Sequence, residues 1–349
     1  MTDELALLER PAARGHALPA PYLLFLGDTV VPGFAKTAFG LRDWAGERCV
    51  GEYALPAATG STGLPVLTPR AAAAKGARAM VIGVANQGGV IPAAWLPAML
   101  EAIAAGLDLA AGLHARLGDI PVLREAAAAR GTALIDLRTP PENLPIASGR
   151  KRTGRRLLTV GTDCALGKKY TALAITRGLV ARGIDATFRA SGQTGIMIAG
   201  EGIAIDAVVA DFAAGAAELL SPAAAPDHLD VIEGQGSLFH PAYAPVSLAL
   251  LHGSQPDLFV VCHQPGRTHI LGHAHYAVPS IEAVIAQTVA VGRLTNDAIR
   301  CAGVSLNTAG LDAAAAAAVI AATGERLGLS VADPIRGGAA FERLLDACS

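Results

Sequence analysis

Short apolar runs alternate with stretches of helical periodicity along most of the chain. In the first half, strand-like runs cover Tyr22–Leu26, Ala79–Val84 and Thr132–Leu137, with helical stretches near Ala93–Ala105 and Pro121–Arg130. Such alternation is typical of parallel sheets covered by helices on both faces. The pattern therefore predicts an α/β fold.

A second series of strands and helices follows a break in this pattern. The segment Thr139–Arg152, TPPENLPIASGRKR, is rich in proline and polar residues and has no apolar period, which is typical of a linker. Beyond it we expect a helix over Lys169–Arg182 and strands over Arg156–Val160, Ile184–Arg189, Leu229–Ile232, Leu258–Cys262 and Gly303–Leu306. We therefore expect two domains, residues 1–150 and 151–349.

Composition and charge narrow the class of protein. A net charge of −2 over 349 residues, without a large basic block, gives no reason to expect nucleic-acid binding. The apolar runs have the length of strands and not of membrane spans, and the first residues lack the pattern of a secretory signal. The five cysteines show neither metal-site nor disulfide spacing. These features predict a cytoplasmic protein that acts on a small-molecule substrate.

The strongest chemical signal is a glycine-rich loop between a predicted strand and a predicted helix. It consists of Gly161, Thr162, Asp163, Cys164, Ala165, Leu166, Gly167, Lys168 and Lys169. Backbone N–H groups of such a loop, a helix N-terminus and a lysine together bind phosphate oxygens. The spacing is one residue longer than the common G-x-x-x-x-G-K pattern and is similar to that of dethiobiotin synthetases. We therefore predict a phosphate-binding P-loop.

One position departs from nucleotide hydrolases. Lys169 stands where those enzymes place the Ser or Thr that ligates magnesium, and Thr171 comes two residues too late to replace it. A second cation suits a phosphate-rich ligand but removes a magnesium ligand. The loop thus predicts binding of a phosphorylated ligand and gives little support for ATP hydrolysis.

Glu233 is the predicted catalytic carboxylate. It ends the apolar strand in LDVIEGQG, the place where P-loop proteins carry an acid that faces the loop. In that position it could hold a metal-bound water or take a proton. An acid at a strand end can also simply cap the following helix.

Three further loops follow predicted strands and so are expected at the same carboxyl edge, where open α/β sheets bind ligands. One contributes His263 and Arg267, whose imidazole and guanidinium suit a proton transfer and a carboxylate. Asn307 follows another strand. The remaining loop offers hydroxyl, amide and backbone donors from Ser191, Gly192, Gln193 and Thr194.

Other candidate residues carry weaker signals. His269, His273 and His275 in HILGHAH invite a metal interpretation, but on a helix the third histidine would point away from the first two, so no metal site is predicted. Cys164 inside the P-loop could carry an acyl group or could be a small packing residue. Neither glycine-rich run of the first half has dinucleotide-binding spacing, which argues against NAD.

Several motifs together resemble one prokaryotic family defined by a domain of unknown function. They are GTDCALGKKYTA, ASGQTGIMIAG, DVIEGQGSLFHP and CHQPGRTH, with GFAKTAFGLRDW and GVANQGGVIP in the first half. The resemblance implies a Rossmann-like N-terminal domain and a P-loop NTPase-like C-terminal domain with a mostly parallel sheet. It also implies D-glutamate N-acetyltransferase activity, with a racemase of N-acetyl amino acids as functional partner.

On this resemblance, acetyl-CoA would place its phosphates in the P-loop, and Asn307 could read the edge of its adenine. N-acetylation needs a base and donors for the tetrahedral oxyanion. We expect Glu233 or His263 to be the base, and Arg267 with the loop from Ser191 to Thr194 to hold the substrate carboxylates. Two alternatives remain, an ATP- and magnesium-dependent ligase of the dethiobiotin-synthetase type and a nucleotide-binding regulator without turnover. A homo-oligomer is also expected.

Overall fold

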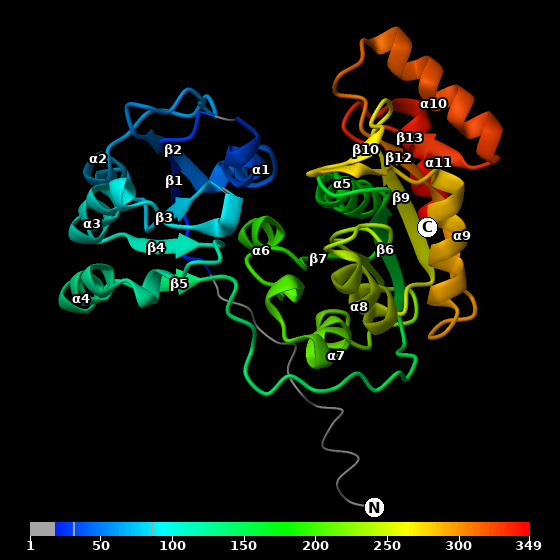
Figure 1. Cartoon of the computed structure of the whole chain (residues 1–349), viewed down its shortest axis with the longest axis horizontal. Helices are drawn as coiled ribbons and strands as arrows, with labels where there is room; N and C mark the ends of the chain where they lie inside the picture. Colours follow the sequence, from blue (N-terminus) through cyan, green and yellow to red (C-terminus); the bar gives the residue numbers. More distant parts are fainter. Residues whose placement is uncertain (1–17, 31, 85–86) are drawn as a thin grey trace, which may run out of the picture. The chain divides into compact units, whose positions relative to one another are not determined.

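The computed structural model describes residues 18–30, 32–84 and 87–349. These residues divide into two compact units (Figure 1). The described part of the N-terminal unit consists of residues 18–140 and 193–204, and that of the C-terminal unit of residues 141–192 and 205–349. A short segment from the second half of the chain thus belongs to the first unit, which a single boundary at residue 150 did not anticipate.

The N-terminal unit is built on a five-stranded parallel sheet with the order β2-β1-β3-β4-β5. This order is typical of a doubly wound, Rossmann-like sheet. Its strands are β1 (Tyr22–Gly27), β2 (Cys49–Ala54), β3 (Ala79–Ile82), β4 (Asp108–Ala111) and β5 (Leu134–Asp136).

Helices cover the sheet of the N-terminal unit. They are α1 (Lys36–Ala45), α2 (Pro69–Ala74), α3 (Leu96–Ala104), α4 (Pro121–Arg130) and α6 (Gln193–Ala199). Leu23, Phe25, Met80 and Ile82 occupy alternate positions on their strands and join one buried cluster with residues of α2, α3 and α4. Helix α6 packs against α1. Short 3₁₀ turns cover Pro32–Ala35, Gly46–Arg48, Gln87–Gly89, Ala93–Trp95 and Leu117–Asp119.

The C-terminal unit has a six-stranded parallel sheet in the order β13-β12-β9-β6-β8-β7. The strand that precedes the P-loop, β6, therefore lies between β9 and β8. The bounds are β6 (Arg155–Gly161), β7 (Ala186–Arg189), β8 (Leu229–Ile232), β9 (Leu258–His263), β12 (Arg300–Leu306) and β13 (Ser330–Ala332).

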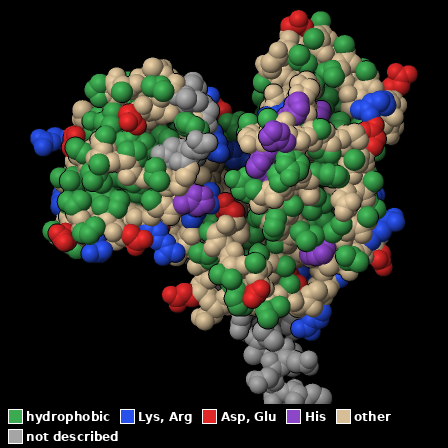
Figure 2. Space-filling model, viewed as in Figure 1, with side chains coloured by type: hydrophobic (Ala, Val, Ile, Leu, Met, Phe, Trp, Pro, Cys, Tyr) green, Lys and Arg blue, Asp and Glu red, His purple; other side chains and the backbone are tan. Residues whose placement is uncertain are grey.

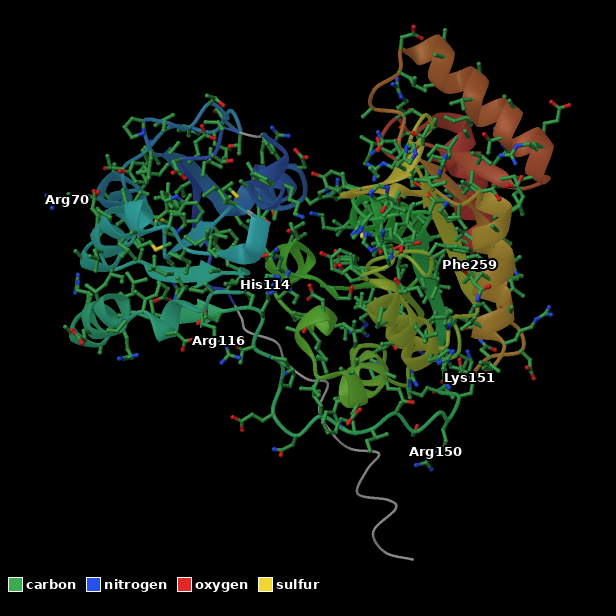
Figure 3. All side chains as sticks on the ribbon, viewed as in Figure 1. Arg70, His114, Arg116, Arg150, Lys151 and Phe259 are labelled. Carbon is green, nitrogen blue, oxygen red and sulfur yellow. The ribbon has the colours of Figure 1, made fainter. Side chains whose placement is uncertain are left out.

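Two groups of helices pack on this sheet. Helices α5 and α11 contact each other and cover one side, while α8 and α9 pack against β6 and β9 (Figure 1). Phe259 of β9 is fully buried between these layers (Figure 3). The bounds are α5 (Lys168–Ala181), α7 (Ala210–Leu220), α8 (Ala244–Ser254), α9 (Ile281–Gly292), α10 (Ala313–Leu327) and α11 (Gly338–Cys348), with a 3₁₀ turn at Ile205–Ala207.

The predicted helix over the histidine-rich segment is wrong. Residues His269–Ile270 (β10) and His273–Ala277 (β11) pair as an antiparallel hairpin. Gly272 lies in the turn at φ +80°, a conformation that interrupts a helix. Histidine side chains gather over this hairpin in Figure 2. Among the described residues, no helix combines the length and apolarity that a bilayer crossing requires.

Candidate active site at the P-loop

The P-loop follows β6 at the carboxyl edge of the C-terminal sheet. A Cβ added to Gly161 would lie 3.2 Å from Lys168 Nζ, and Gly167 has φ +106°, so both positions favour glycine. Ala165 also adopts a left-handed conformation, with φ +53°, which costs a non-glycine residue energy and is common at functional loops. Lys168 begins α5, so the positive end of that helix lies at the loop.

The two lysines of the loop have different surroundings. Lys168 is buried, its Nζ donates to the Asp163 carbonyl at 2.7 Å, and burial lowers its pKa. The Lys168 ammonium thus donates to a neutral peptide carbonyl. An anionic ligand bound in the loop would neutralise the positive charge of this lysine. Lys169 is half-buried, lies over the ring of Tyr170 at 5.2 Å, and its charge lowers the pKa of Glu233. These positions suit a ligand that carries several phosphates.

Thr171 does not replace the missing magnesium ligand. Its Oγ1 is buried and lies 2.8 Å from Ser305 Oγ, with Cys262 Sγ at 3.5 Å. The Thr171 hydroxyl is therefore engaged in hydrogen bonds inside the domain, between α5 and the strands β9 and β12. This arrangement agrees with a loop that binds phosphates through lysines and amides.

Arg267 clamps the loop through Asp163. Its Nη1 donates to Asp163 Oδ2 at 2.9 Å and to the Cys164 carbonyl at 2.7 Å, while Nη2 donates to Gln264 Oε1 at 2.6 Å. The Asp163 carboxylate is fully buried and also accepts from the backbone N–H of Leu271 and Cys164. Arg267 thus positions the P-loop, and its role toward a substrate carboxylate stays a prediction.

Glu233 lies at the end of β8 with 4% of its surface exposed. Its Oε2 accepts backbone N–H bonds from Ser191 and Gly192, each at 3.1 Å. Burial raises the pKa of Glu233 to about 7, against the opposing effects of Lys169 and the two amides. A carboxylate with a pKa near neutrality is suited to take a proton at physiological pH.

His263 and Asn307 lie on the other side of β6. His263 Nδ1 is 3.0 Å from Thr162 Oγ1, and burial, followed by the charge of Arg267, lowers the pKa of the imidazole. The backbone N–H of Asn307 donates to the His263 carbonyl at 2.8 Å, and its Oδ1 accepts from Ala309. Both residues are thus at the expected edge, separated from Glu233 by the P-loop strand.

The predicted loop from Ser191 to Thr194 is divided between the units. Ser191 and Gly192 belong to the C-terminal unit and hold Glu233, whereas Gln193 and Thr194 begin α6 in the N-terminal unit. There Thr194 Oγ1 lies 2.9 Å from Thr37 Oγ1. Within the C-terminal unit, the structure thus places Ser191 and Gly192 beside Glu233 at the P-loop site.

His240 was missed by the sequence reasoning, although it lies in the quoted motif DVIEGQGSLFHP. It is 1% exposed, and its Nδ1 accepts backbone N–H bonds from Ala242 at 3.1 Å and Tyr243 at 3.2 Å. The rings of Tyr243 and His273 pack on it, with centroids 4.6 and 5.0 Å away. A histidine a few residues after the strand-end acid was the available signal.

His240 also belongs to a group with metal-type side chains. Within the described part of the chain, Asp163, Cys164 and His240 form the group whose ligand atoms all lie within 4.8 Å of one another. Because Nδ1 accepts two N–H bonds, the neutral ring holds its proton on Nε2, and that nitrogen has no lone pair for a metal. His269 and His275 of the hairpin are exposed and lie outside this group, as do the exposed Asp206 and Asp211.

Two family models match the chain. A P-loop domain of unknown function, DUF1611_C, matches residues 145–345, and a Rossmann-like domain of unknown function, DUF1611_N, matches residues 47–140. A crystal structure of a DUF1611 family protein from Anabaena variabilis has a TM-score of 0.86 and 35% identity, and the match covers 94% of this chain and 99% of that one.

Two similar relatives carry a functional name. A protein of Tritonibacter scottomollicae is 47% identical over 95% of this chain and 98% of its own length, and one of a Pseudoalteromonas species is 46% identical over 91% and 96%. Both are named D-glutamate N-acetyltransferase. The P-loop family model spans the P-loop, Glu233, His240 and Arg267. The chain therefore belongs to the DUF1611 family, with a Rossmann-like N-terminal and a P-loop C-terminal domain.

Proposed function

We propose that this protein is a D-glutamate N-acetyltransferase that uses acetyl-CoA as donor. The observation that carries the proposal is the likeness to two enzymes of that name at 46–47% identity over more than nine-tenths of the chain. The product would be N-acetyl-D-glutamate, which a racemase of N-acetyl amino acids could consume. We also propose that the protein forms a homo-oligomer.

The P-loop supports a CoA-type ligand. CoA carries a diphosphate and a 3′-phosphate, and the loop offers amides, the N-terminus of α5, Lys168 and Lys169. The absence of a Ser or Thr after Lys168, and the use of Thr171 by Ser305, remove the magnesium ligand that ATP hydrolysis requires. Binding of acetyl-CoA needs no such ligand.

Glu233 is the proposed base. The amino group of an amino acid is mostly protonated at neutral pH and must lose a proton before it attacks the acetyl carbonyl. Glu233 has a pKa of about 7, so a large share of it is ionised at that pH. The amides of Ser191 and Gly192 fix one carboxylate oxygen and leave the other for the proton. His263 is the alternative base from the sequence.

The test is acetyl transfer with purified protein. We expect CoA release and a product with the mass of N-acetylglutamate when D-glutamate is the acceptor, and much slower turnover with L-glutamate and D-alanine. Lys168→Ala should abolish turnover, while Lys75→Ala, an exposed lysine of the N-terminal unit, should not change it. Consumption of Mg-ATP in place of acetyl-CoA would contradict the proposal.

A further inference from the structure

We propose that His240 recognises the pantetheine arm of CoA. Its Nε2–H group donates a hydrogen bond to an uncharged oxygen of the arm, a hydroxyl or an amide carbonyl, next to the phosphates in the P-loop. This inference rests on the proposed use of acetyl-CoA and deepens it, because it identifies the residue that distinguishes CoA from a nucleotide that ends in a phosphate. His240 is a binding residue here and takes no part in the chemical step.

The first support is the fixed state of the His240 imidazole. The residue is 1% exposed, and its Nδ1 accepts backbone N–H bonds from Ala242 at 3.1 Å and Tyr243 at 3.2 Å. A second ring proton would leave both donors without an acceptor, and burial also lowers the pKa of the imidazole. The ring is therefore neutral and holds its proton on Nε2.

The second support is the unused donor. Among the described residues, no hydrogen bond uses His240 Nε2. A donor that is shielded from water and unpaired costs free energy, which an acceptor on a ligand recovers. A ring nitrogen of His240 lies within 4.8 Å of Cys164 Sγ and of an Asp163 carboxylate oxygen. The imidazole with its unused donor is therefore at the P-loop.

The third support is the charge around the imidazole. Of the charges that act on the pKa of His240, the negative charge of Asp163 has the largest effect and the positive charge of Lys168 the smallest. The buried Asp163 carboxylate is paired with Arg267, so the two together bring no net positive charge to the ring. A terminal phosphate would need such a charge beside it, whereas an uncharged oxygen needs only the neutral N–H donor.

The fourth support is the aromatic surface beside His240. The rings of Tyr243 and His273 pack on the imidazole, with centroids 4.6 and 5.0 Å away, and the ring of Tyr276 lies 6.2 Å from that of His273. Tyr243 and Tyr276 are 54% and 52% exposed. The arm of CoA carries two methyl groups close to its phosphate, and exposed aromatic rings offer such groups a surface on which to pack.

The strand order separates this surface from the expected adenine site. His240 lies in the loop after β8, whereas Asn307 follows β12, and β6 and β9 lie between these two strands. Ligands of open α/β sheets bind across the carboxyl ends of the strands. A CoA molecule with its diphosphate at the end of β6 would thus have its adenine on the β12 side, and its arm would leave past His240.

The test compares two ligands that differ in the arm, CoA and adenosine 3′-phosphate 5′-diphosphate, by calorimetric titration. His240→Asn keeps an acceptor near the Nδ1 position for the N–H groups of Ala242 and Tyr243 and removes the Nε2–H donor. It should weaken the binding of CoA about tenfold and that of the nucleotide by less than about twofold, because only CoA loses a hydrogen bond.

Two further variants serve as controls, with thermal melting to check that each one folds. His240→Gln keeps an N–H donor near the Nε2 position and should bind CoA more tightly than His240→Asn does. His252→Asn changes a half-buried histidine of α8 whose Nε2 lies 3.2 Å from the Val291 carbonyl. It should bind both ligands like the wild type.

A second measurement needs no destabilising substitution. In wild-type protein with isotope-labelled histidine, NMR should show a neutral imidazole with its proton on Nε2. CoA should shift the signal of that proton, and adenosine 3′-phosphate 5′-diphosphate should leave it nearly unchanged. An equal shift with both ligands would place the His240 donor on a phosphate and overturn the inference.

The calorimetric outcomes separate this inference from the proposed function. If a folded His240→Asn binds CoA as tightly as the wild type, or weakens for both ligands equally, recognition of the arm by His240 is overturned, and the function stands as long as N-acetyl-D-glutamate forms. If only CoA binding weakens while no D-amino acid is acetylated, the inference stands and the acceptor is wrong. If the wild type does not bind CoA, both are overturned.

Discussion

Arg267 and Asp163 form an ion pair with 2.9 Å between Nη1 and Oδ2, in which the carboxylate has no exposed surface. The pair joins the loop after β9 to the P-loop, and the same guanidinium nitrogen also donates to the Cys164 carbonyl. The shape of the P-loop therefore depends on a residue about a hundred positions further along the chain.

Removing the Arg267 guanidinium should disturb the proposed binding site for acetyl-CoA. Arg267→Ala leaves a buried carboxylate without its partner, which should reduce the free energy of unfolding by about 3–5 kcal/mol and raise the KM for acetyl-CoA at least about tenfold. Arg267→Lys keeps the charge and loses the two-pronged geometry. Its stability and its KM for acetyl-CoA should therefore lie between those of the wild type and those of Arg267→Ala. Steady-state kinetics with both substrates tests this. A rise confined to the KM for D-glutamate would instead place Arg267 on the substrate carboxylate.

The pH profile should report Glu233. Because the pKa of Glu233 is raised to about 7 and the carboxylate is the active form, kcat/KM for D-glutamate should increase as pH rises through about 7. In Glu233→Gln this inflection should disappear and turnover should fall by about 10²–10⁴-fold. A wild-type profile that is flat between pH 6 and 8, or a Gln variant with full activity, would remove Glu233 from the role of base.

The same carboxylate should make stability depend on pH. Its folded-state pKa of about 7 exceeds the ordinary value of 4.5, so the folded protein keeps a proton that the unfolded chain loses between these values. The stability that this proton contributes is present below about pH 4.5 and is lost as pH rises to about 7. The shift corresponds to roughly 3 kcal/mol. Glu233→Gln, which stays neutral, should therefore gain stability relative to wild type between pH 4.5 and pH 8 in denaturant titrations.

Gly234, the residue after Glu233, packs its backbone closely against β6. A Cβ there would lie 1.6 Å from the Thr159 carbonyl oxygen, a backbone atom that can shift only with β6. Gly234→Ala should therefore destabilise the protein by about 3 kcal/mol or more and abolish activity. The matched control is Gly310→Ala, where nothing lies within 4 Å of the added Cβ. Equal melting temperatures for the two variants would contradict this packing.

Local patterns predicted several elements with their bounds. The strand over Leu229–Ile232 and the helix over Pro121–Arg130 have the predicted bounds, because apolar runs and a terminal glycine mark them in the sequence. Strands β2 and β4 were missed: β2 mixes polar and apolar residues, and β4 has only four residues with alanine in half of them. The separation of Gln193 from Gly192 depends on tertiary packing, which no local pattern reports.

In the candidate site, too, local patterns predicted some features, and others depend on tertiary packing. The P-loop and Glu233 follow from spacing at strand ends, whereas the pairing of Arg267 with Asp163 and of His240 with the P-loop depends on how distant loops meet. The histidine hairpin was mistaken for a helix because three histidines within seven residues dominated the interpretation over Gly272.

The most direct test of the account is calorimetric titration of the wild-type protein and Lys168→Ala with acetyl-CoA and, separately, with Mg-ATP. We expect the wild type to bind acetyl-CoA, and Lys168→Ala to bind it at least about a hundredfold more weakly, because a cation in the P-loop is lost. Lys75→Ala, an exposed lysine in the N-terminal unit, should bind like the wild type. Binding of Mg-ATP without binding of acetyl-CoA would contradict the account and favour a ligase.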